Sequence, residues 1–316
     1  MASPFVAIVG PTGSGKSALA LFLARHFRAE IVNCDSVQVY RHFNIGTAKI
    51  TAAEMQGVPH HLIDMLEPEE VFTAGDFARV ARQCLREIAA RGNLPVVVGG
   101  TGFYLRAMID GLFAGPQRDD ALRKRLALRE EKRAGSMHRI LRRLDAQAAA
   151  RIHPHDRNKV MRALEVRLLA KRPMTELHAE GSEPLTDFAP VLLGLDPPRA
   201  ELFELLNRRC EQMIEKGLVL EVENILAQGI AVTAKPFESL GYKQILRFVQ
   251  GVCTQEQAVD EMRVETRRYA KRQWTWFKRD TRVSWISGFG HMLHVQQQAV
   301  ETIVKTNPHK AFFRTT

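Results

Sequence analysis

The chain has 316 residues, 45% of them hydrophobic and 25% charged, which indicates a soluble globular protein with one main domain and an insertion or second lobe. The lack of an uninterrupted apolar run of about 18 residues excludes a membrane-spanning helix, and no secretory signal is indicated. The four cysteines are scattered and form no C-x-x-C pair, which predicts a reducing cytoplasm and no zinc ribbon. The net charge of +10 predicts either a polyanionic partner or a basic surface without one.

The most informative stretch is Gly10-Pro11-Thr12-Gly13-Ser14-Gly15-Lys16-Ser17, which fits the phosphate-loop pattern G-x-x-x-x-G-K-[ST]. A buried parallel strand is predicted before it at 5–9, and good helix formers follow at 18–24. This order turns backbone N–H groups toward phosphate. Lys16 adds a positive charge, and the Ser17 hydroxyl is a candidate ligand for Mg²⁺. The loop predicts a diphosphate or polyphosphate site and does not by itself specify ATP.

A second short strand is predicted at 31–32, with Asp35 and Ser36 just beyond its carboxyl end. Ligands bind at this edge of open α/β sheets, so we expect Asp35 in the same crevice as the phosphate loop. Its carboxylate suits a magnesium ligand, a general base or a helix N-cap, and the spacing does not separate a functional role from the cap. A further strand at 60–64 would place His60 and His61 on opposite faces, one buried and one exposed.

Apolar residues recur three and four apart at 74–90, which predicts an amphipathic helix. Another buried strand is predicted at 93–98, before the glycines at 99, 100 and 102. This alternation of strands and helices predicts a parallel sheet with its binding edge at the strand ends. No acidic residue follows Val98, where an ATPase usually places a magnesium-binding aspartate, and this argues against a motor ATPase or helicase.

The segment from 115 to 184 has a different character. It holds 17 Lys and Arg against 10 Asp and Glu and shows only helical periodicity, which predicts a helical insertion with a basic surface. One face of it carries Arg157, Asn158, Lys159 and Arg162. Taken alone, such a face is more often solvated surface than a nucleic-acid site.

Strand periodicity returns at 189–195, and a helix is predicted at 199–215. A second basic segment, 261–282, places Arg263, Arg267 and Lys271 at i+4 steps, where like charges repel and an anionic partner would offset the cost. Its aromatic residues are candidates for stacking on bases, although at least one tryptophan is expected to pack against the sheet: Tyr269, Trp274 and Trp276. A last strand is predicted at 283–286, and one weak helix follows residue 290.

Six segments together resemble the bacterial tRNA dimethylallyltransferases, also called tRNA isopentenyltransferases. They are the phosphate loop, Asp35–Tyr40, Ile45–Lys49, Pro59–Asp64, Gly99–Tyr104, and Arg272-Gln273 with Thr275–Phe277. The resemblance runs in order along nearly the whole chain. The phosphate loop alone is shared by many families, whereas the set is highly specific. Asn44 and Ile50 depart from the Asp and Pro that are common in the family.

The resemblance implies an α/β fold with a P-loop NTPase-like parallel sheet flanked by helices and an inserted all-helical tRNA-binding domain. The expected catalytic core is discontinuous, at 1–113 and 186–290, with the insertion at 114–185 and a C-terminal tail at 291–316. The implied reaction transfers a dimethylallyl group from dimethylallyl diphosphate to N6 of the adenosine just 3′ of the anticodon in tRNA. Mg²⁺ is the implied cofactor, and we expect a monomer that works without a membrane.

In that reaction the phosphate loop holds the leaving diphosphate, and Lys16, Mg²⁺ near Ser17 and the loop N–H groups stabilise its developing charge. Thr12 adds hydrogen bonds, the family match adds Arg209 as a diphosphate contact, and Asp35 is the candidate base for the poorly nucleophilic adenine amine. The expected tRNA contacts are Asp35, Ser36, Val37, Gln38, Thr101, Arg123, Asn158, Lys159, Arg162, Gly241, Tyr242, Lys243, Arg272 and Gln273.

Two other functions stay open at this point. An enzyme that prenylates free adenine nucleotides would share the core but would not need the basic insertion or the Arg-rich helix. A P-loop nucleotide kinase is disfavoured by the missing acidic residue after Val98.

Overall fold

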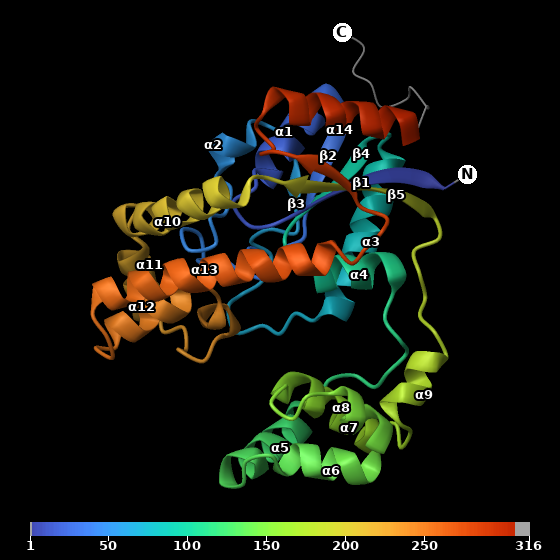
Figure 1. Cartoon of the computed structure of the whole chain (residues 1–316), viewed down its shortest axis with the longest axis vertical. Coiled ribbons are helices and arrows are strands. Elements are labelled where there is room, and N and C mark those ends of the chain that lie inside the picture. Colours follow the sequence, from blue (N-terminus) through green and yellow to red (C-terminus); the bar gives the residue numbers. More distant parts are fainter. Residues whose placement is uncertain (1, 307–316) are drawn as a thin grey trace. The chain divides into compact units, whose positions relative to one another are not determined.

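A computed structural model describes residues 2–306, and its centre is a six-stranded parallel sheet with the strand order β3-β2-β4-β1-β5-β6 (Figure 1). The strands are β1 (Ser3–Val9), β2 (Ala29–Asn33), β3 (His60–His61), β4 (Leu94–Val98), β5 (Phe188–Asp196) and β6 (Ser284–Ser287). The carboxyl ends of the parallel strands meet at one edge of this sheet, as the sequence predicts.

β3 is shorter than the predicted strand, and the expectation of one buried and one exposed histidine is wrong. Leu62 and Asp64 have φ angles of 60° and 51°, which an extended strand does not allow, so the strand ends at His61. Both histidines are half-buried. His60 Nδ1 lies 2.8 Å from the carbonyl oxygen of Val58, and His61 Nε2 lies 2.6 Å from a carboxylate oxygen of Glu30.

The helices predicted at 74–90 and 199–215 are confirmed as α3 (Ala74–Ala90) and α10 (Arg199–Glu215). α3 begins at a capping box between Thr73 and Asp76, which satisfies backbone donors at its first turn. The other helices of this part of the chain are α1 (Lys16–His26), α2 (Ala52–Met55), α4 (Gly102–Asp110), α11 (Leu218–Ala227), η1 (Lys235–Glu238), α12 (Tyr242–Val249), α13 (Gln255–Phe277) and α14 (Leu293–Thr306).

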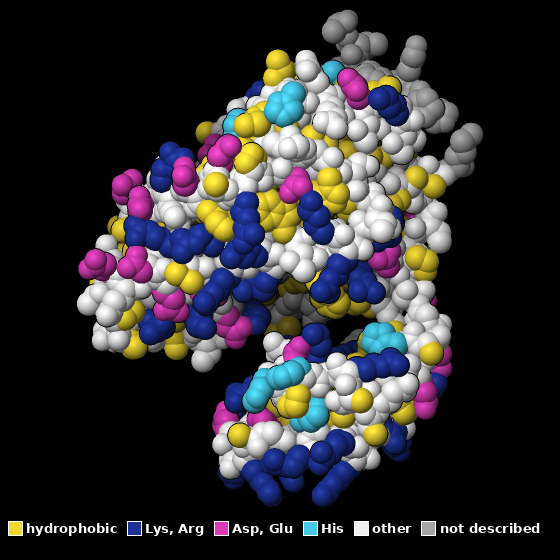
Figure 2. All heavy atoms as spheres, in the orientation of Figure 1, with side chains coloured by type: hydrophobic (Ala, Val, Ile, Leu, Met, Phe, Trp, Pro, Cys, Tyr) yellow, Lys and Arg dark blue, Asp and Glu magenta, His cyan; other side chains and the backbone are white. Residues whose placement is uncertain are grey.

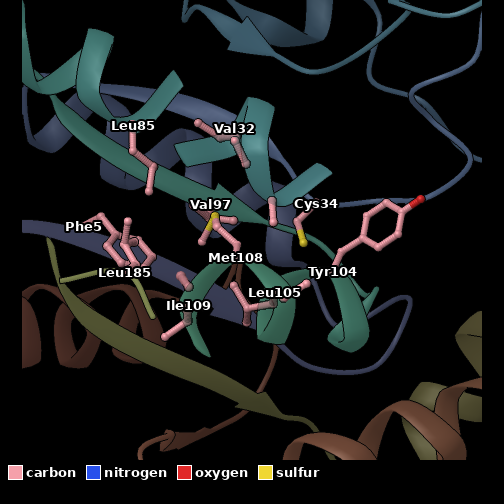
Figure 3. Close-up of a cluster of buried hydrophobic side chains, with 14 of the residues drawn as sticks. Phe5, Val32, Cys34, Leu85, Val97, Tyr104, Leu105, Met108, Ile109 and Leu185 are labelled. Carbon is pink, nitrogen blue, oxygen red and sulfur yellow. The ribbon is translucent and has the colours of Figure 1, made fainter. Parts of the chain in front are cut away.

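Both faces of the sheet are covered, which explains why its strands are apolar throughout. Side chains alternate along β1, so Phe5 packs in one cluster and Ile8 in the other. α3 and α4 cover the first face, where Leu85 and Met108 gather around Val97 (Figure 3). α1 and α14 cover the opposite face. The predicted C-terminal helix is therefore part of the core, and positions 307–316 of the expected tail lie outside the described residues.

The chain divides into two compact units, one formed by residues 2–109 with 185–306 and the other by 110–184. The second unit contains α5 (Asp120–Lys132), α6 (Ser136–Leu144), α7 (Ala146–Arg151), α8 (Arg157–Leu169) and α9 (Met174–Ala179). Its hydrophobic core is its own, built around Leu141, Val160 and Leu164. Between residues 2 and 306, no helix is both long enough and apolar enough to cross a membrane.

Candidate active site

The phosphate loop at 10–17 joins β1 to α1, and its path requires glycine, as Gly13 and Gly15 illustrate. Gly13 has a φ of 78°, and a Cβ there would lie 2.9 Å from a methyl group of Leu206 in α10. Gly15 has a φ of 85°, and a Cβ there would lie 2.8 Å from the backbone nitrogen of Gly290. L-residues rarely adopt such angles. Gly15 also provides no side-chain cap for α1, which leaves the first-turn N–H groups available to an anion.

Lys16 is the first residue of α1, and its ammonium group turns back onto the loop. It donates to the carbonyl oxygens of Gly10 at 3.1 Å and Pro11 at 2.8 Å. Burial lowers the pKa of Lys16 to about 8, helped by the nearby Arg209 and opposed by Asp35. The Ser14 hydroxyl is buried and has no hydrogen-bond partner among the described residues. A buried ammonium and an unpaired hydroxyl in one loop favour an anionic ligand.

A cavity of about 620 Å³ lies beside the loop, within the size range of ligand pockets. Its walls come from the phosphate loop, the end of β2, the turn at 46–47, α10, the turn at 238–244 and α13. The lining side chains that can bind a ligand through charge, hydrogen bonds or stacking include Thr12, Asp35, Arg209, Lys243, Tyr269 and Arg272. The fold therefore brings together candidate residues that the sequence holds far apart.

Asp35 follows β2 and its carboxylate already has one structural task. Its Oδ1 atom accepts the backbone N–H groups of Val37 at 2.8 Å and Gln38 at 3.2 Å. This arrangement caps the turn at 36–39, so the capping role is present in the structure. The carboxylate also lines the cavity. A carboxylate with one oxygen engaged can still accept a proton through the other.

The charges around the cavity favour an anion. Burial lowers the pKa of Arg209, yet a guanidinium stays protonated in proteins. Arg272 lies over the Tyr269 ring, with its guanidinium carbon 5.8 Å from the ring centroid. Neither arginine forms a salt bridge within residues 2–306. Apart from Asp35, the acidic side chains that line the cavity are already in ion pairs: Glu238 with Lys235, Glu261 with Arg247, and Glu265 with Arg268.

Gln273 and Thr101, two of the expected RNA contacts, hold segments of the site together. The buried Gln273 side chain accepts the Thr12 N–H at 2.7 Å and donates to the Gly100 carbonyl at 3.0 Å. The Thr101 hydroxyl accepts the Ser36 N–H at 3.1 Å. These bonds fix the phosphate loop, the loop after β4 and the Asp35 turn relative to one another. Gln273 therefore acts in this structure as a positioning residue.

Tyr242, one of the expected tRNA contacts, has a wholly buried side chain. α12 begins at this residue and directs it into the cluster around Phe43 and Phe237. Its hydroxyl accepts the Gly46 N–H at 3.0 Å and donates to Glu221, and burial and Glu221 raise the pKa of Tyr242. The neighbouring Gly241 and Lys243 do line the cavity.

Glu221 was missed by sequence reasoning. One oxygen of its carboxylate accepts the N–H of Asn44 at 3.2 Å, and both accept that of Ile45. It thereby holds the turn whose Gly46 and Thr47 line the cavity, and Gln38 donates to the Thr47 carbonyl at 3.0 Å. The signal was present, because an acidic residue among the apolar residues of α11 usually has a buried partner.

Arg123 and Arg162 of the helical unit bind a carboxylate of the same unit. Glu165 is fully buried and accepts two hydrogen bonds of 2.7 Å from Arg123, one of 2.6 Å from Arg162 and one of 2.9 Å from the Asp119 N–H. Burial alone would raise the pKa of Glu165, but these donors outweigh it and lower the pKa to about 2. By contrast, Asn158 and Lys159 are exposed at the start of α8.

The residues at the phosphate loop fit a Mg²⁺ ion held mainly by diphosphate and water. The Ser17 side chain is exposed in the first turn of α1 and offers a hydroxyl oxygen. Across residues 2–306 there is no cluster of three or more His, Cys, Asp or Glu side chains that would hold a metal without a substrate. Magnesium commonly takes a few protein oxygens and completes its shell with substrate phosphates and water.

Comparison with known proteins agrees with this geometry. A family model described as IPP transferase matches residues 38–280. A tRNA dimethylallyltransferase of Solibacter usitatus is 54% identical over 96% of this chain and 98% of its own length. A second, from Koribacter versatilis, is 51% identical over 95% of this chain and 97% of its own length.

Two solved structures are also similar. The full-length tRNA isopentenylpyrophosphate transferase of Bacillus halodurans is 37% identical, with a TM-score of 0.72 over 98% of both chains. A eukaryotic dimethylallyltransferase acting on tRNA is 26% identical, with a TM-score of 0.80 over 98% of this chain and 81% of that one. The similarity therefore extends over the core and the helical unit alike.

Proposed function

Because the chain belongs to the IPP transferase family, we propose that it transfers a dimethylallyl group from dimethylallyl diphosphate to N6 of the adenosine immediately 3′ of the anticodon in tRNA. The observation that carries this proposal is the cavity, where Thr12, Asp35 and Arg209 meet beside Lys16. An anion-binding loop and a carboxylate at one cavity provide a place for a leaving group and a proton acceptor. The names of the close relatives support tRNA as the acceptor.

The donor's diphosphate would lie on the phosphate loop at Gly10, Pro11, Thr12, Gly13, Ser14, Gly15, Lys16 and Ser17. As the bond from C1 to oxygen breaks, negative charge grows on the diphosphate. The first-turn N–H groups of α1, the Lys16 ammonium and the Arg209 guanidinium stabilise that charge because they are fixed before the reaction begins. A Mg²⁺ ion near Ser17 would neutralise part of it as a Lewis acid.

The acceptor base would lie against Asp35. The adenine amine forms a bond to C1 as diphosphate leaves, and one proton of the amine passes to the Asp35 carboxylate. Oδ1 of Asp35 is held by Val37 and Gln38, so Oδ2 is the atom that we assign as proton acceptor. A base in an RNA loop can leave its stack at modest cost and enter a protein pocket.

The RNA backbone would contact cationic and polar side chains of both units. Lys243 and Arg272 lie at the cavity, and Asn158 and Lys159 are exposed on the helical unit. We propose that the protein works as a monomer. A cytoplasmic location suits the four free cysteines, which a reducing compartment preserves.

The experiment uses purified protein with Mg²⁺, dimethylallyl diphosphate and either unmodified tRNA or AMP, followed by mass analysis of the nucleosides. The expected result is dimethylallyl adenosine from the tRNA reaction alone. Product from AMP alone would replace this proposal with a free-nucleotide prenyltransferase. No product from either acceptor, together with ATP turnover without RNA, would replace it with a nucleotide kinase.

A further inference from the structure

The two neighbouring tryptophans of α13 have opposite environments. Trp274 is half-buried against α10, and its indole N–H donates to Asp196 at 2.7 Å. Trp276 is 40% exposed, and Phe103 at the start of α4 is 50% exposed. Trp274 is therefore the tryptophan that packs, and Trp276 is a large aromatic side chain left on the surface.

The Trp276 indole packs against a defined position of the backbone. A Cβ added to Gly102 would lie 2.2 Å from both Cδ1 and Nε1 of Trp276, so the five-membered ring lies directly against the Gly102 backbone. No other residue fits at position 102 without displacing the indole. An aromatic ring that is held against the backbone and is 40% exposed is preorganised for stacking, because little side-chain entropy is lost on binding.

The position of Trp276 connects it to the cavity. Tyr269, Arg272 and Trp276 follow one another at intervals of three and four residues, so they share one face of α13, and Arg279 lies two residues beyond the helix end at Phe277. Tyr269 and Arg272 line the cavity. Trp276 lies one helical turn further along, about 6 Å from Arg272 at 1.5 Å of rise per residue.

The charges beside Trp276 match a phosphate backbone. Arg272 on α13 and Arg279 just after the end of α13 are exposed, as is Arg106 on α4. Hydrogen bonds from Arg282 are the main cause that lowers the pKa of Asp280, and Arg106 lies close enough to contribute. None of these three arginines forms a salt bridge with a described residue. Figure 2 shows Lys and Arg side chains gathered over α13, with hydrophobic side chains between them.

We propose that Trp276, seated on Gly102, stacks on the base next to the target adenosine, while Arg272 and Arg279 contact the adjoining phosphates. This inference rests on the proposed function and adds an RNA-binding subsite outside the cavity. Its effect is to keep the neighbouring base out of the cavity, so that only the target base faces Asp35. The partner is single-stranded loop RNA, since a duplex would not present a free base face.

The test compares the wild type with Trp276→Ala and Trp276→Phe, using an anticodon stem-loop RNA. Stacking is worth enough that KM for the RNA should rise about 10-fold in Trp276→Ala, within a range of roughly 5-fold to 150-fold. KM for dimethylallyl diphosphate should not change. Trp276→Phe should restore most of the RNA affinity because it keeps an aromatic face. Val252→Ala is the matched control, because Val252 is an exposed apolar residue outside the cavity lining.

A second readout locates the contact. Two stem-loops carry 2-aminopurine, one on each side of the target adenosine, and its fluorescence reports stacking. The proposal is supported if either stem-loop shows a change in 2-aminopurine emission on binding that is lost in Trp276→Ala and kept in Trp276→Phe. If the wild type transfers the group to the stem-loop and Trp276→Ala has the same kinetics and the same emission change, this inference is overturned. The proposed function would then still stand. No transfer by the wild type would count against the proposed function and not against the subsite.

Discussion

Asp35 combines two tasks in one carboxylate. Oδ1 caps the turn after β2 through the N–H groups of Val37 and Gln38, and the proposed chemistry uses Oδ2. The cap and the base therefore do not exclude each other. Removal of the whole side chain would disturb both, so alanine is a poor test of the base.

Asp35→Asn separates the two tasks. The asparagine side-chain oxygen can accept the same two N–H groups, so the turn should stay folded. Without a carboxylate, we expect kcat for tRNA prenylation to fall by on the order of 10²-fold or more. Tm and the affinity for tRNA should stay close to those of the wild type. Unchanged kcat in Asp35→Asn would show that another group takes the proton.

Lys16 gives the donor site a pH dependence. Its pKa of about 8 means that the ammonium group is charged below this pH and neutral above it. Since the charged form attracts diphosphate, affinity for dimethylallyl diphosphate without RNA should fall on the order of 10-fold from about pH 7 to about pH 9.5. Calorimetry at several pH values measures this fall. Lys16→Arg stays charged and should give a flatter profile, and an equal slope in both proteins would contradict the role of Lys16.

At the scale of the element, α8 presents two kinds of basic residue. Arg162 donates to buried Glu165 and to the Pro116 carbonyl, at 2.6 and 3.0 Å. Lys159 is exposed, and its ion pair with Asp156 is exposed as well. Arg162 therefore stabilises the helical unit, whereas Lys159 is accessible to RNA.

We expect Arg162→Ala to destabilise the helical unit by about 1–3 kcal/mol, because it removes donors from a buried carboxylate. Lys159→Ala should leave stability unchanged, since exposed pairs contribute about 0–1 kcal/mol, and should lower tRNA affinity with a reduced salt slope. Thermal unfolding and a salt titration of binding measure both effects. If Arg162→Ala leaves Tm unchanged, the Glu165 network does not stabilise the unit.

The basic row of α13 shows how neighbouring helices relieve charge repulsion. Arg263 pairs with Glu211 and Asp260 at 2.6 Å, and Arg267 donates to Asn207. The i+4 repulsion expected from the sequence is thus offset within the chain, largely by α10. An anionic partner is therefore not needed to explain these two residues, whereas Arg272 forms no salt bridge with a described residue and remains available to RNA.

At the scale of the whole molecule, the chain builds separate hydrophobic cores for its two units. Among residues 2–306, only residues of 110–184 contribute to the core of the helical unit. In the other unit, the Leu185 N–H donates to the Ile109 carbonyl at 2.8 Å, so the two points where the chain leaves and re-enters this unit adjoin. A short linker can join them.

Replacing 110–184 with a short Gly-Ser linker should therefore leave a folded protein. We expect it to bind dimethylallyl diphosphate like the wild type, because the loop and cavity are complete without the insertion. Its tRNA affinity should fall together with the salt slope, since Lys159 and its neighbours are removed. Retention of full tRNA affinity would show that the helical unit is not an RNA-binding element.

The sequence by itself determined the features that depend on neighbouring residues and on the family motifs. Apolar patterning along the chain predicted β1, β4 and α3, because apolar spacing reports whether an element has one or two buried faces. The glycine and lysine pattern predicted the phosphate loop. The set of motifs pointed to the family, and the placement of Asp35 after a strand predicted its presence at the binding edge.

Only the tertiary structure decided which partner each polar side chain takes. Gln273 bonds to Thr12 across 261 positions, and Arg123 binds Glu165 in another helix. Such pairs depend on which distant elements pack together, and the spacing of residues along the chain does not indicate those contacts. The same is true of Trp274 and Trp276, whose different exposures follow from their directions on α13 and from the neighbours that the fold places there.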